Sequence, residues 1–143
     1  MKRTLCFVLL CSLIILLISG CQMKPDLSLL KIEEETAPAA IQNFVREQSG
    51  CNGVDLYSDG VHGDYLFLNA RNVTQGEMAA YFADVSCKIN DGILSIYFSE
   101  KLTEEYSERM NNKVIYKIES IIKYHTIRVF KNGEEISFDV VGA

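Results

Sequence analysis

The 143-residue sequence contains only two prolines and two histidines, and it has no internal repeat or low-complexity stretch. With 23% charged residues and seven phenylalanines, this composition argues against long disorder. The chain is long enough for one small domain and too short for two. Its formal net charge is −5, so it lacks the basic excess with which proteins bind nucleic acid. We therefore expect no nucleic-acid partner.

Common catalytic and cofactor-binding motifs are also missing. The sequence has no GxSxG, P-loop, HExxH or Rossmann glycine pattern, and no CxxC spacing that would indicate a metal site. His62 lies between Asp59 and Asp64, and these three residues are the only local candidates for metal binding. The same Asp, Gly and His context is typical of a solvated turn. We expect no cofactor, and an enzyme with its site around His62 is the alternative hypothesis.

The N-terminal segment has the order of an export signal. Lys2 and Arg3 precede fourteen mostly apolar residues, 5–18. As a helix this stretch would be about 21 Å long, which is shorter than the ~30 Å hydrocarbon core of a bilayer. It therefore predicts a secretory signal peptide over residues 1–20 rather than a permanent span. Without these residues the formal charge becomes −7, because they include two basic residues and no acidic one.

The signal ends in Ile18-Ser19-Gly20-Cys21, and here the sequence resembles bacterial lipoprotein precursors, whose lipobox ends in two small residues and a cysteine. The resemblance covers about the first 22 residues and does not extend to the domain. It implies that cleavage falls before Cys21 and that Cys21 is lipidated, with palmitate-type acyl chains as the membrane anchor. The implied location is the cell membrane or outer membrane, on its extracytoplasmic side.

Of the five cysteines, only Cys51 and Cys87 lie beyond the lipobox. An even pair in an exported protein predicts a disulfide, because export usually leads to an oxidising compartment. The bond would close a loop of about 36 residues and stabilise the fold by roughly 4 kcal/mol at most. Two separate free thiols are the other interpretation.

One amphipathic helix is predicted near the start of the domain. Thr36-Ala37-Pro38 is a helix-start signal, a stripe of apolar residues follows it, and Gly50 is an end signal. We therefore predict a helix over residues 37–49. Short strands are expected around 54–56 and 64–73.

Asp91-Gly92 predicts a two-residue hairpin turn between strands 81–89 and 93–98. The turn and the apolar alternation agree on one register, which favours strands over the competing helix at 74–90. The implied pairs are Ile89–Leu94, Cys87–Ile96 and Val85–Phe98 on an apolar face, and Lys88–Ser95 and Ser86–Tyr97 on a polar face.

From residue 102 to 124, apolar residues recur at intervals of three and four, so we predict one long helix. Asn111-Asn112 leaves open a break followed by a strand from Val114. Asn132-Gly133 then predicts a second hairpin. Its implied pairs are Lys131–Glu134, Val129–Ile136 and Ile127–Phe138.

The predicted fold class is α+β, with an antiparallel sheet of about six strands built from hairpins and two helices packed on one face. Residues 21–35 are expected to be a lipidated N-terminus and tether, and residues 36–143 a single extracytoplasmic domain. The apolar residues of the tether, Leu27, Leu29, Leu30 and Ile32, leave open that part of it docks on the domain. The polar sheet face, with Ser86, Lys88, Ser95 and Tyr97, could bind a protein or glycan. We therefore expect a membrane-anchored binding module of the cell envelope rather than an enzyme; the sequence identifies no partner or ligand.

Overall fold

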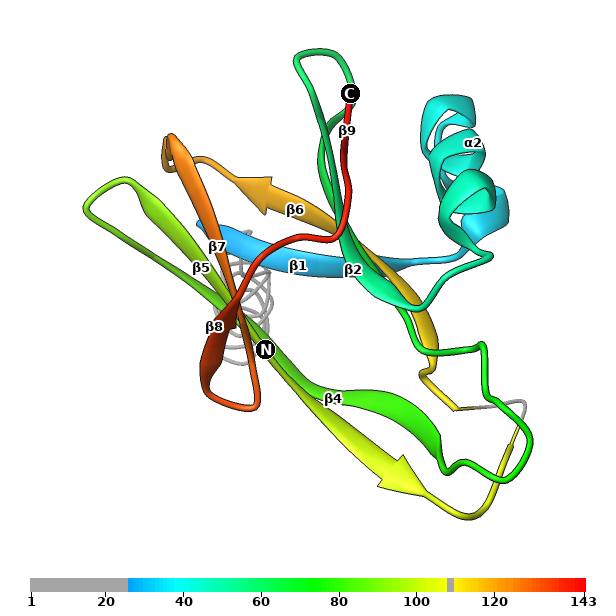
Figure 1. Cartoon of the computed structure of the whole chain (residues 1–143). Helices are drawn as coiled ribbons and strands as arrows, with labels where there is room; N and C mark the ends of the chain where they lie inside the picture. The colour runs from blue at the N-terminus through cyan, green and yellow to red at the C-terminus, as the bar shows by residue number, and fades with distance from the viewer. Residues whose placement is uncertain (1–25, 108–109) are drawn as a thin grey trace, which may run out of the picture.

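The computed structural model describes residues 26–107 and 110–143. This part of the chain contains one α-helix, one short 3-10 helix and nine strands (Figure 1). No helix within it is long and apolar enough to cross a membrane. In chain order the elements are β1 (Leu27–Ile32), η1 (Glu34–Thr36), α2 (Ala39–Gln48), β2 (Gly53–Asp59), β3 (Gly63–Asn69), β4 (Ala79–Asn90), β5 (Ile93–Thr103), β6 (Lys113–Ser120), β7 (Thr126–Lys131), β8 (Glu134–Ile136) and β9 (Val141–Gly142).

The strands form two sheets that pack face to face. The five-stranded sheet has the order β1-β6-β3-β2-β9, and the four-stranded sheet has the order β4-β5-β7-β8. The pairs β2–β9 and β5–β7 are parallel, and the others are antiparallel. Helix α2 packs on the side of the five-stranded sheet that faces away from the four-stranded one (Figure 1). The α+β class is therefore confirmed, but the prediction of one six-stranded sheet with two helices is wrong.

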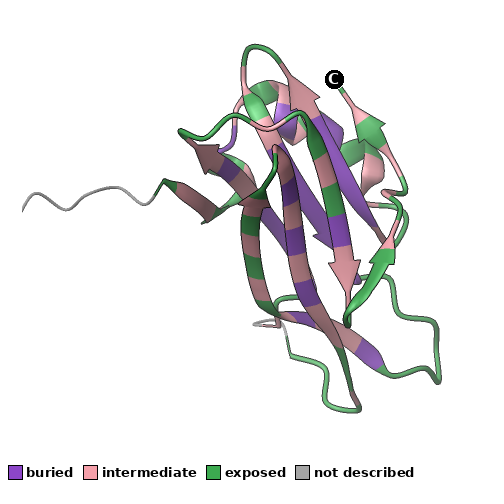
Figure 2. Ribbon diagram, turned by 90° about the vertical axis from the view of Figure 1, so that its left-hand side faces the viewer, coloured by how far each residue is buried: buried purple, intermediate pink, exposed green. Residues whose placement is uncertain are grey.

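Successive side chains of β3 point to opposite faces of the sheet, so this strand contributes to two separate cores. Leu66 and Leu68 face the four-stranded sheet, whereas Tyr65 and Phe67 face α2. All four side chains are at most 3% exposed. Figure 2 shows buried residues along the strands and on the helix. A central strand buried on both faces needs apolar side chains on both sides, and β3 supplies them.

The predicted first helix is confirmed as α2, which begins after Pro38 and buries Ile41, Phe44 and Val45. The final strand β9 passes this layer at Gly142, where a Cβ atom would lie 2.5 Å from the Phe44 ring. A glycine at this position therefore lets the end of the chain pack against the helix.

The predicted β4–β5 hairpin is also confirmed. Asp91 and Gly92 both have positive φ, 50° and 73°, as a two-residue type I′ turn requires. The observed pairs include Ile89–Leu94, Cys87–Ile96, Lys88–Ser95 and Ser86–Tyr97, which is the predicted register.

The predicted Val85–Phe98 pair does not form. The register shifts between Ala83 and Ser86, so that Asp84 and Val85 together lie opposite Phe98. Asp84 has φ of 55° in this β-bulge. A bulge on the edge strand β4 twists its free edge, which hinders pairing with another chain.

The second predicted hairpin is confirmed in its turn and its first pairs. Asn132 and Gly133 have φ of 53° and 88°, and Lys131–Glu134 and Val129–Ile136 pair as predicted. The predicted Ile127–Phe138 pair is absent, because β8 ends at Ile136 and the chain then crosses towards β9.

The predicted long helix over 102–124 is wrong. Residues up to Thr103 continue β5, and Lys113–Ser120 form β6, so the alternative strand after Asn111-Asn112 is the observed one. Strand β6 lies between β1 and β3 and is buried on both faces. Its apolar residues therefore do not alternate with polar ones, and their spacing resembles that of a helix.

The expected tether also differs from the structure. Residues 27–32 form β1, which pairs with β6 along its whole length, from Leu27–Ser120 to Ile32–Ile115. Leu27 and Leu29 pack against the core between the sheets. The folded domain therefore includes residues 27–32 and does not begin at residue 36.

Asp55 is the most deeply buried carboxylate of the described residues, at 3% exposed, and its Oδ1 accepts the Val140 N–H at 3.1 Å. Burial raises the pKa of Asp55, the Val140 N–H partly opposes this rise, and Asp139 adds to it. Because the folded pKa lies above the unfolded value of about 3.9, the folded protein holds this proton more tightly. This contribution to stability is present at low pH and is lost as pH rises through the folded pKa.

Replacing Asp55 with asparagine removes the titrating group and keeps an oxygen acceptor for the Val140 N–H. The wild type should lose this contribution to its stability as pH rises from 4 to 7, whereas Asp55→Asn should not. We therefore expect the difference in the free energy of unfolding, Asp55→Asn minus wild type, to be larger at pH 7 than at pH 4. Urea unfolding of both proteins at the two pH values measures this difference. A difference that is independent of pH would show that burial does not perturb this carboxylate.

Candidate functional site

The outer face of the four-stranded sheet carries a cluster of aromatic and basic side chains. Strand pairing aligns them in two rows across the sheet. The first row is Lys88–Ser95–Arg128, and the second is Ser86–Tyr97–Phe130–Glu135. We call these seven residues the aromatic–basic face.

Two aromatic rings form the centre of this face. Tyr97 and Phe130 are stacked, with ring centroids 4.8 Å apart and an interplanar angle of 16°. Lys88 Nζ lies 5.0 Å from the Tyr97 centroid, and Arg128 Cζ lies 5.5 Å from the Phe130 centroid. Each ring thus has a cation within the range of cation–π attraction.

Hydrogen bonds hold the charged groups of the face in place. Arg128 Nε donates to Glu135 Oε1 at 2.6 Å, and its Nη2 donates to Glu135 Oε2, so that the pair is bidentate. This pairing lowers the pKa of Glu135. The Lys88 side chain lowers the pKa of the Tyr97 hydroxyl by hydrogen bonding to it. The face therefore offers two stacked rings, an arginine paired with a glutamate, and a lysine next to the Tyr97 ring.

The sequence alone predicts four of the seven residues of this face. Ser86, Lys88, Ser95 and Tyr97 have the predicted orientation, because the predicted register of the β4–β5 hairpin is correct from the turn to the Ser86–Tyr97 pair. Arg128, Phe130 and Glu135, on β7 and β8, are not predicted. They lie beside Tyr97 only because β5 and β7 pair in parallel. The Asn132-Gly133 turn does offer one signal for Phe130. Because side chains alternate along a strand, Phe130 must lie on the face opposite to that of Val129.

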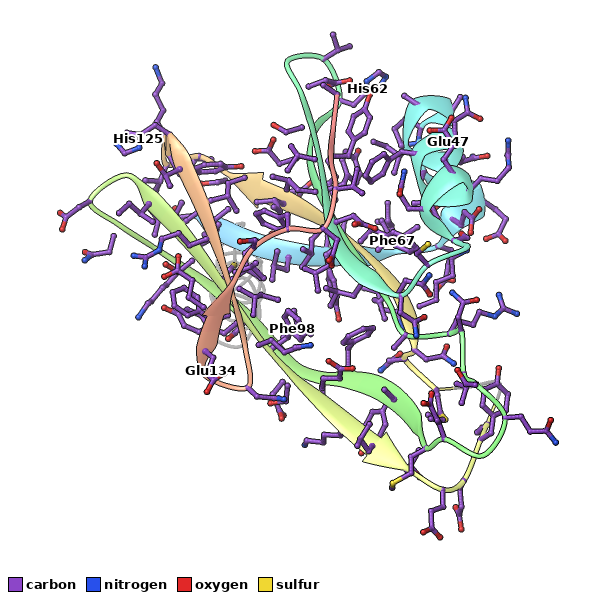
Figure 3. All side chains as sticks on the ribbon, in the orientation of Figure 1. Glu47, His62, Phe67, Phe98, His125 and Glu134 are labelled. Atoms are coloured by element: carbon purple, nitrogen blue, oxygen red, sulfur yellow. The ribbon has the colours of Figure 1, made fainter. Side chains whose placement is uncertain are left out.

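His62 lies in the loop between β2 and β3, next to Val61, which is 85% exposed (Figure 3). Its Nδ1 is 2.7 Å from Asp59 Oδ2, which also accepts a hydrogen bond from the Tyr57 hydroxyl at 2.8 Å. Asp59 Oδ1 accepts the backbone N–H groups of Val61 and His62. These donors, His62 first, hold the pKa of Asp59 well below its usual range. The carboxylate thus closes a turn and orients the imidazole.

The structure does not bring the three metal candidates together. Asp64 accepts hydrogen bonds from the Ser58 hydroxyl, at 2.5 Å, and from the Tyr124 hydroxyl, whereas Asp59 bonds to His62. Among residues 26–107 and 110–143, no group of three or more His, Cys, Asp or Glu side chains is placed to hold a metal ion. The two carboxylates instead have separate structural partners.

The surface hollows do not favour an active site at His62 either. One hollow is lined by Arg71, Tyr106, Met110, Asn112 and Lys113, and a second opens beside Phe82 at the margin between the two sheets. Two others lie next to η1 and next to α2. His62 lines none of these four hollows within the described structure. A catalytic imidazole is expected at a concave site with convergent polar groups.

The expected disulfide is not formed, because Cys51 and Cys87 are both free in the structure. The Cys51 carbonyl accepts Asn69 Nδ2 at 2.6 Å, which places it at the last residue of β3. Cys87 lies in β4, opposite Ile96 and close to the Asp91-Gly92 turn. The two thiols therefore belong to separate parts of the fold, and a disulfide would need their Cα atoms within about 7 Å.

No known protein family, curated protein or solved structure matches this chain. Its own residues therefore carry the functional argument.

Proposed function

We propose that this chain is a membrane-anchored lipoprotein on the extracytoplasmic side of the cell envelope and acts as a small binding module for another envelope protein. Its lipid anchor is Cys21, which lies outside the described residues together with the rest of the lipobox. Its binding surface is the aromatic–basic face. The observation that carries the proposal is the stack of Tyr97 on Phe130 with a cation over each ring.

The position and composition of this face support a binding role. Among the described elements, the five-stranded sheet and α2 both lie on the other side of the four-stranded sheet, which leaves the face open (Figure 1). Tyrosine, phenylalanine and arginine are the residue types that protein interfaces favour. Their side chains are already held by stacking and by the Arg128–Glu135 pair, so binding would cost little side-chain entropy.

The charges of the face favour a protein partner with a carboxylate. Arg128 is paired with Glu135, but none of the ion pairs among the described residues involves Lys88. The rings stack on each other and lie under cations, which leaves less room for a sugar to stack on them. A partner with an acidic side chain next to an apolar one would match Lys88 and the edges of the rings.

The lipid anchor would assist binding by confining the domain to the membrane surface. A lipid on Cys21 keeps the domain at the membrane surface, where its effective concentration towards other anchored proteins is high. A modest binding face is then sufficient for occupancy, which suits the small area that one sheet face provides.

Site-specific photo-crosslinking in living cells tests the proposal. A photoreactive amino acid replaces Ser95, which lies between Lys88 and Arg128 in its row, in the full-length lipoprotein. The same probe at Asn43, exposed on α2, is the positional control. We expect a discrete protein adduct from position 95 and none from position 43.

Charge reversal at Lys88 makes the test specific. We expect Lys88→Glu to reduce the adduct at least tenfold, because it replaces attraction for a carboxylate with repulsion. Lys101→Glu is the matched control, since Lys101 lies in the same sheet and pairs with Asp84. An adduct that forms equally in Lys88→Glu, or only from position 43, would contradict the proposed surface. Retention of the protein on envelope glycans without any protein adduct would contradict the proposed class of partner.

A further inference from the structure

The loop between β6 and β7 lies beside the point where the chain enters the domain. Leu27 pairs with Ser120, and the Ile121 N–H donates to the Asp26 carbonyl at 3.0 Å. Residue 26 is the first described residue, so this loop is adjacent to the segment that leads back to Cys21.

This loop exposes two isoleucines in succession. Ile121 is 80% exposed and Ile122 is 45% exposed. Val61, in the β2–β3 loop at the same end of the five-stranded sheet, is 85% exposed. Isolated exposed apolar residues are common, whereas two adjacent ones form a small apolar surface that an apolar partner could cover.

Hydrogen bonds fix the loop with its isoleucines outward. Ser120 Oγ donates to the Ile122 carbonyl at 2.7 Å and accepts the Ile122 N–H at 3.0 Å. The His125 N–H donates to the Gly92 carbonyl at 2.9 Å, which ties the loop to the β4–β5 turn. The two turns lie side by side on the left of Figure 1, and His125 is labelled there in Figure 3.

Chain length places this loop near the membrane if Cys21 carries the anchor, so the inference rests on the proposed function. Four residues separate Cys21 from Asp26, and the five Cα-to-Cα steps between them span at most about 18 Å when fully extended. The β6–β7 loop is hydrogen-bonded to Asp26 and must therefore stay within reach of the bilayer surface.

The charges around the loop favour an apolar rather than an electrostatic contact. Lys123 is exposed next to the isoleucines, and the acidic residues Asp26 and Asp91 are exposed nearby. Because the two acidic residues outnumber the one lysine, the attraction would not depend on anionic lipid.

We propose that Ile121 and Ile122 insert into the interface of the lipid bilayer that holds the Cys21 anchor, and that this second contact orients the domain. The β4–β5 end that carries Gly92 then faces the membrane, and the end that carries Leu102 points away from it. The aromatic–basic face stands beside the membrane rather than against it, where another envelope protein can reach it.

The absence of tryptophan from the sequence provides a direct test. Ile121→Trp introduces a single fluorophore at the proposed contact, and Leu102→Trp introduces one at the opposite end, where Leu102 is 62% exposed. Each full-length lipidated variant is reconstituted into phosphatidylcholine vesicles, with and without lipids brominated along their acyl chains. Both positions are exposed, so neither change should disturb the fold.

We expect blue-shifted emission from Ile121→Trp and bromine quenching several-fold stronger than for Leu102→Trp, without any anionic lipid. A protein that sediments with the vesicles but has solvent-like emission at position 121 would overturn the contact and leave the anchor intact. A protein that does not sediment with the vesicles would refute the anchor at Cys21 and, with it, this contact.

Discussion

Replacing Cys21 with alanine is expected to abolish both processing and lipidation of the protein. The thiol of Cys21 is the acceptor of the diacylglyceryl group in the proposed lipoprotein, and alanine offers no nucleophile in its place. The uncleaved precursor should keep residues 1–20 and incorporate no labelled palmitate. Gel mobility, palmitate labelling and the intact mass of the purified protein measure these outcomes.

Cys51→Ala is the matched control for this experiment. Cys51 is exposed and free in the structure, so its replacement should affect neither processing nor labelling. Palmitate labelling that persists in Cys21→Ala but disappears in Cys51→Ala would place the lipid on the wrong cysteine and contradict the assignment.

Phe67→Ala is expected to cause the largest loss of stability among the substitutions considered. The ring is 1% exposed, lies in the central strand β3, and packs in the core under α2 together with Ile41, Phe44 and Val45. Truncation of a buried phenylalanine to alanine typically costs about 3–5 kcal/mol, because it removes apolar burial and leaves a cavity. Chemical unfolding followed by far-ultraviolet circular dichroism measures the change.

Such a loss is a large share of the ~5–15 kcal/mol that stabilises a typical domain. Tyr106→Ala is the control, because Tyr106 is also aromatic but is 57% exposed, and its truncation should cost no more than about 0.5 kcal/mol. Equal effects of the two substitutions would contradict a buried layer between α2 and the five-stranded sheet.

The elements that were predicted correctly have local signals. Helix α2 has a start signal at Pro38 and a one-sided apolar stripe. Both hairpins have turns, Asp91-Gly92 and Asn132-Gly133, whose residues adopt the positive φ that such turns need. In each case the residues that define the element lie within a few positions of one another.

The elements that were missed depend on distant partners. Strand β6 has apolar residues at the spacing of a helix, because its burial between β1 and β3 requires apolar residues on both faces. Residues 27–32 are predicted as part of a tether that could dock on the domain, but no local signal pairs them with β6, about 90 residues further along the chain. The parallel pairing of β5 with β7 has no turn to indicate it.

In the candidate site, too, the residues with local signals are predicted and those that depend on distant pairing are not. The half of the aromatic–basic face on β4 and β5 follows from one hairpin register, whereas Arg128 and Phe130 join it only through the parallel pair. The predicted disulfide failed for a related reason. Cys87 has the predicted inward orientation, but Cys51 is exposed and hydrogen-bonded to Asn69 of β3, a placement that no local pattern encodes.

Mass spectrometry of the native protein, extracted from its own membrane with detergent, tests the central claim most directly. We predict that the N-terminal residue of the mature chain is Cys21 and that it carries a diacylglyceryl group with two or three acyl chains in total. An unmodified Cys21, or a mature chain that begins elsewhere, would contradict the membrane-anchored binding module proposed here.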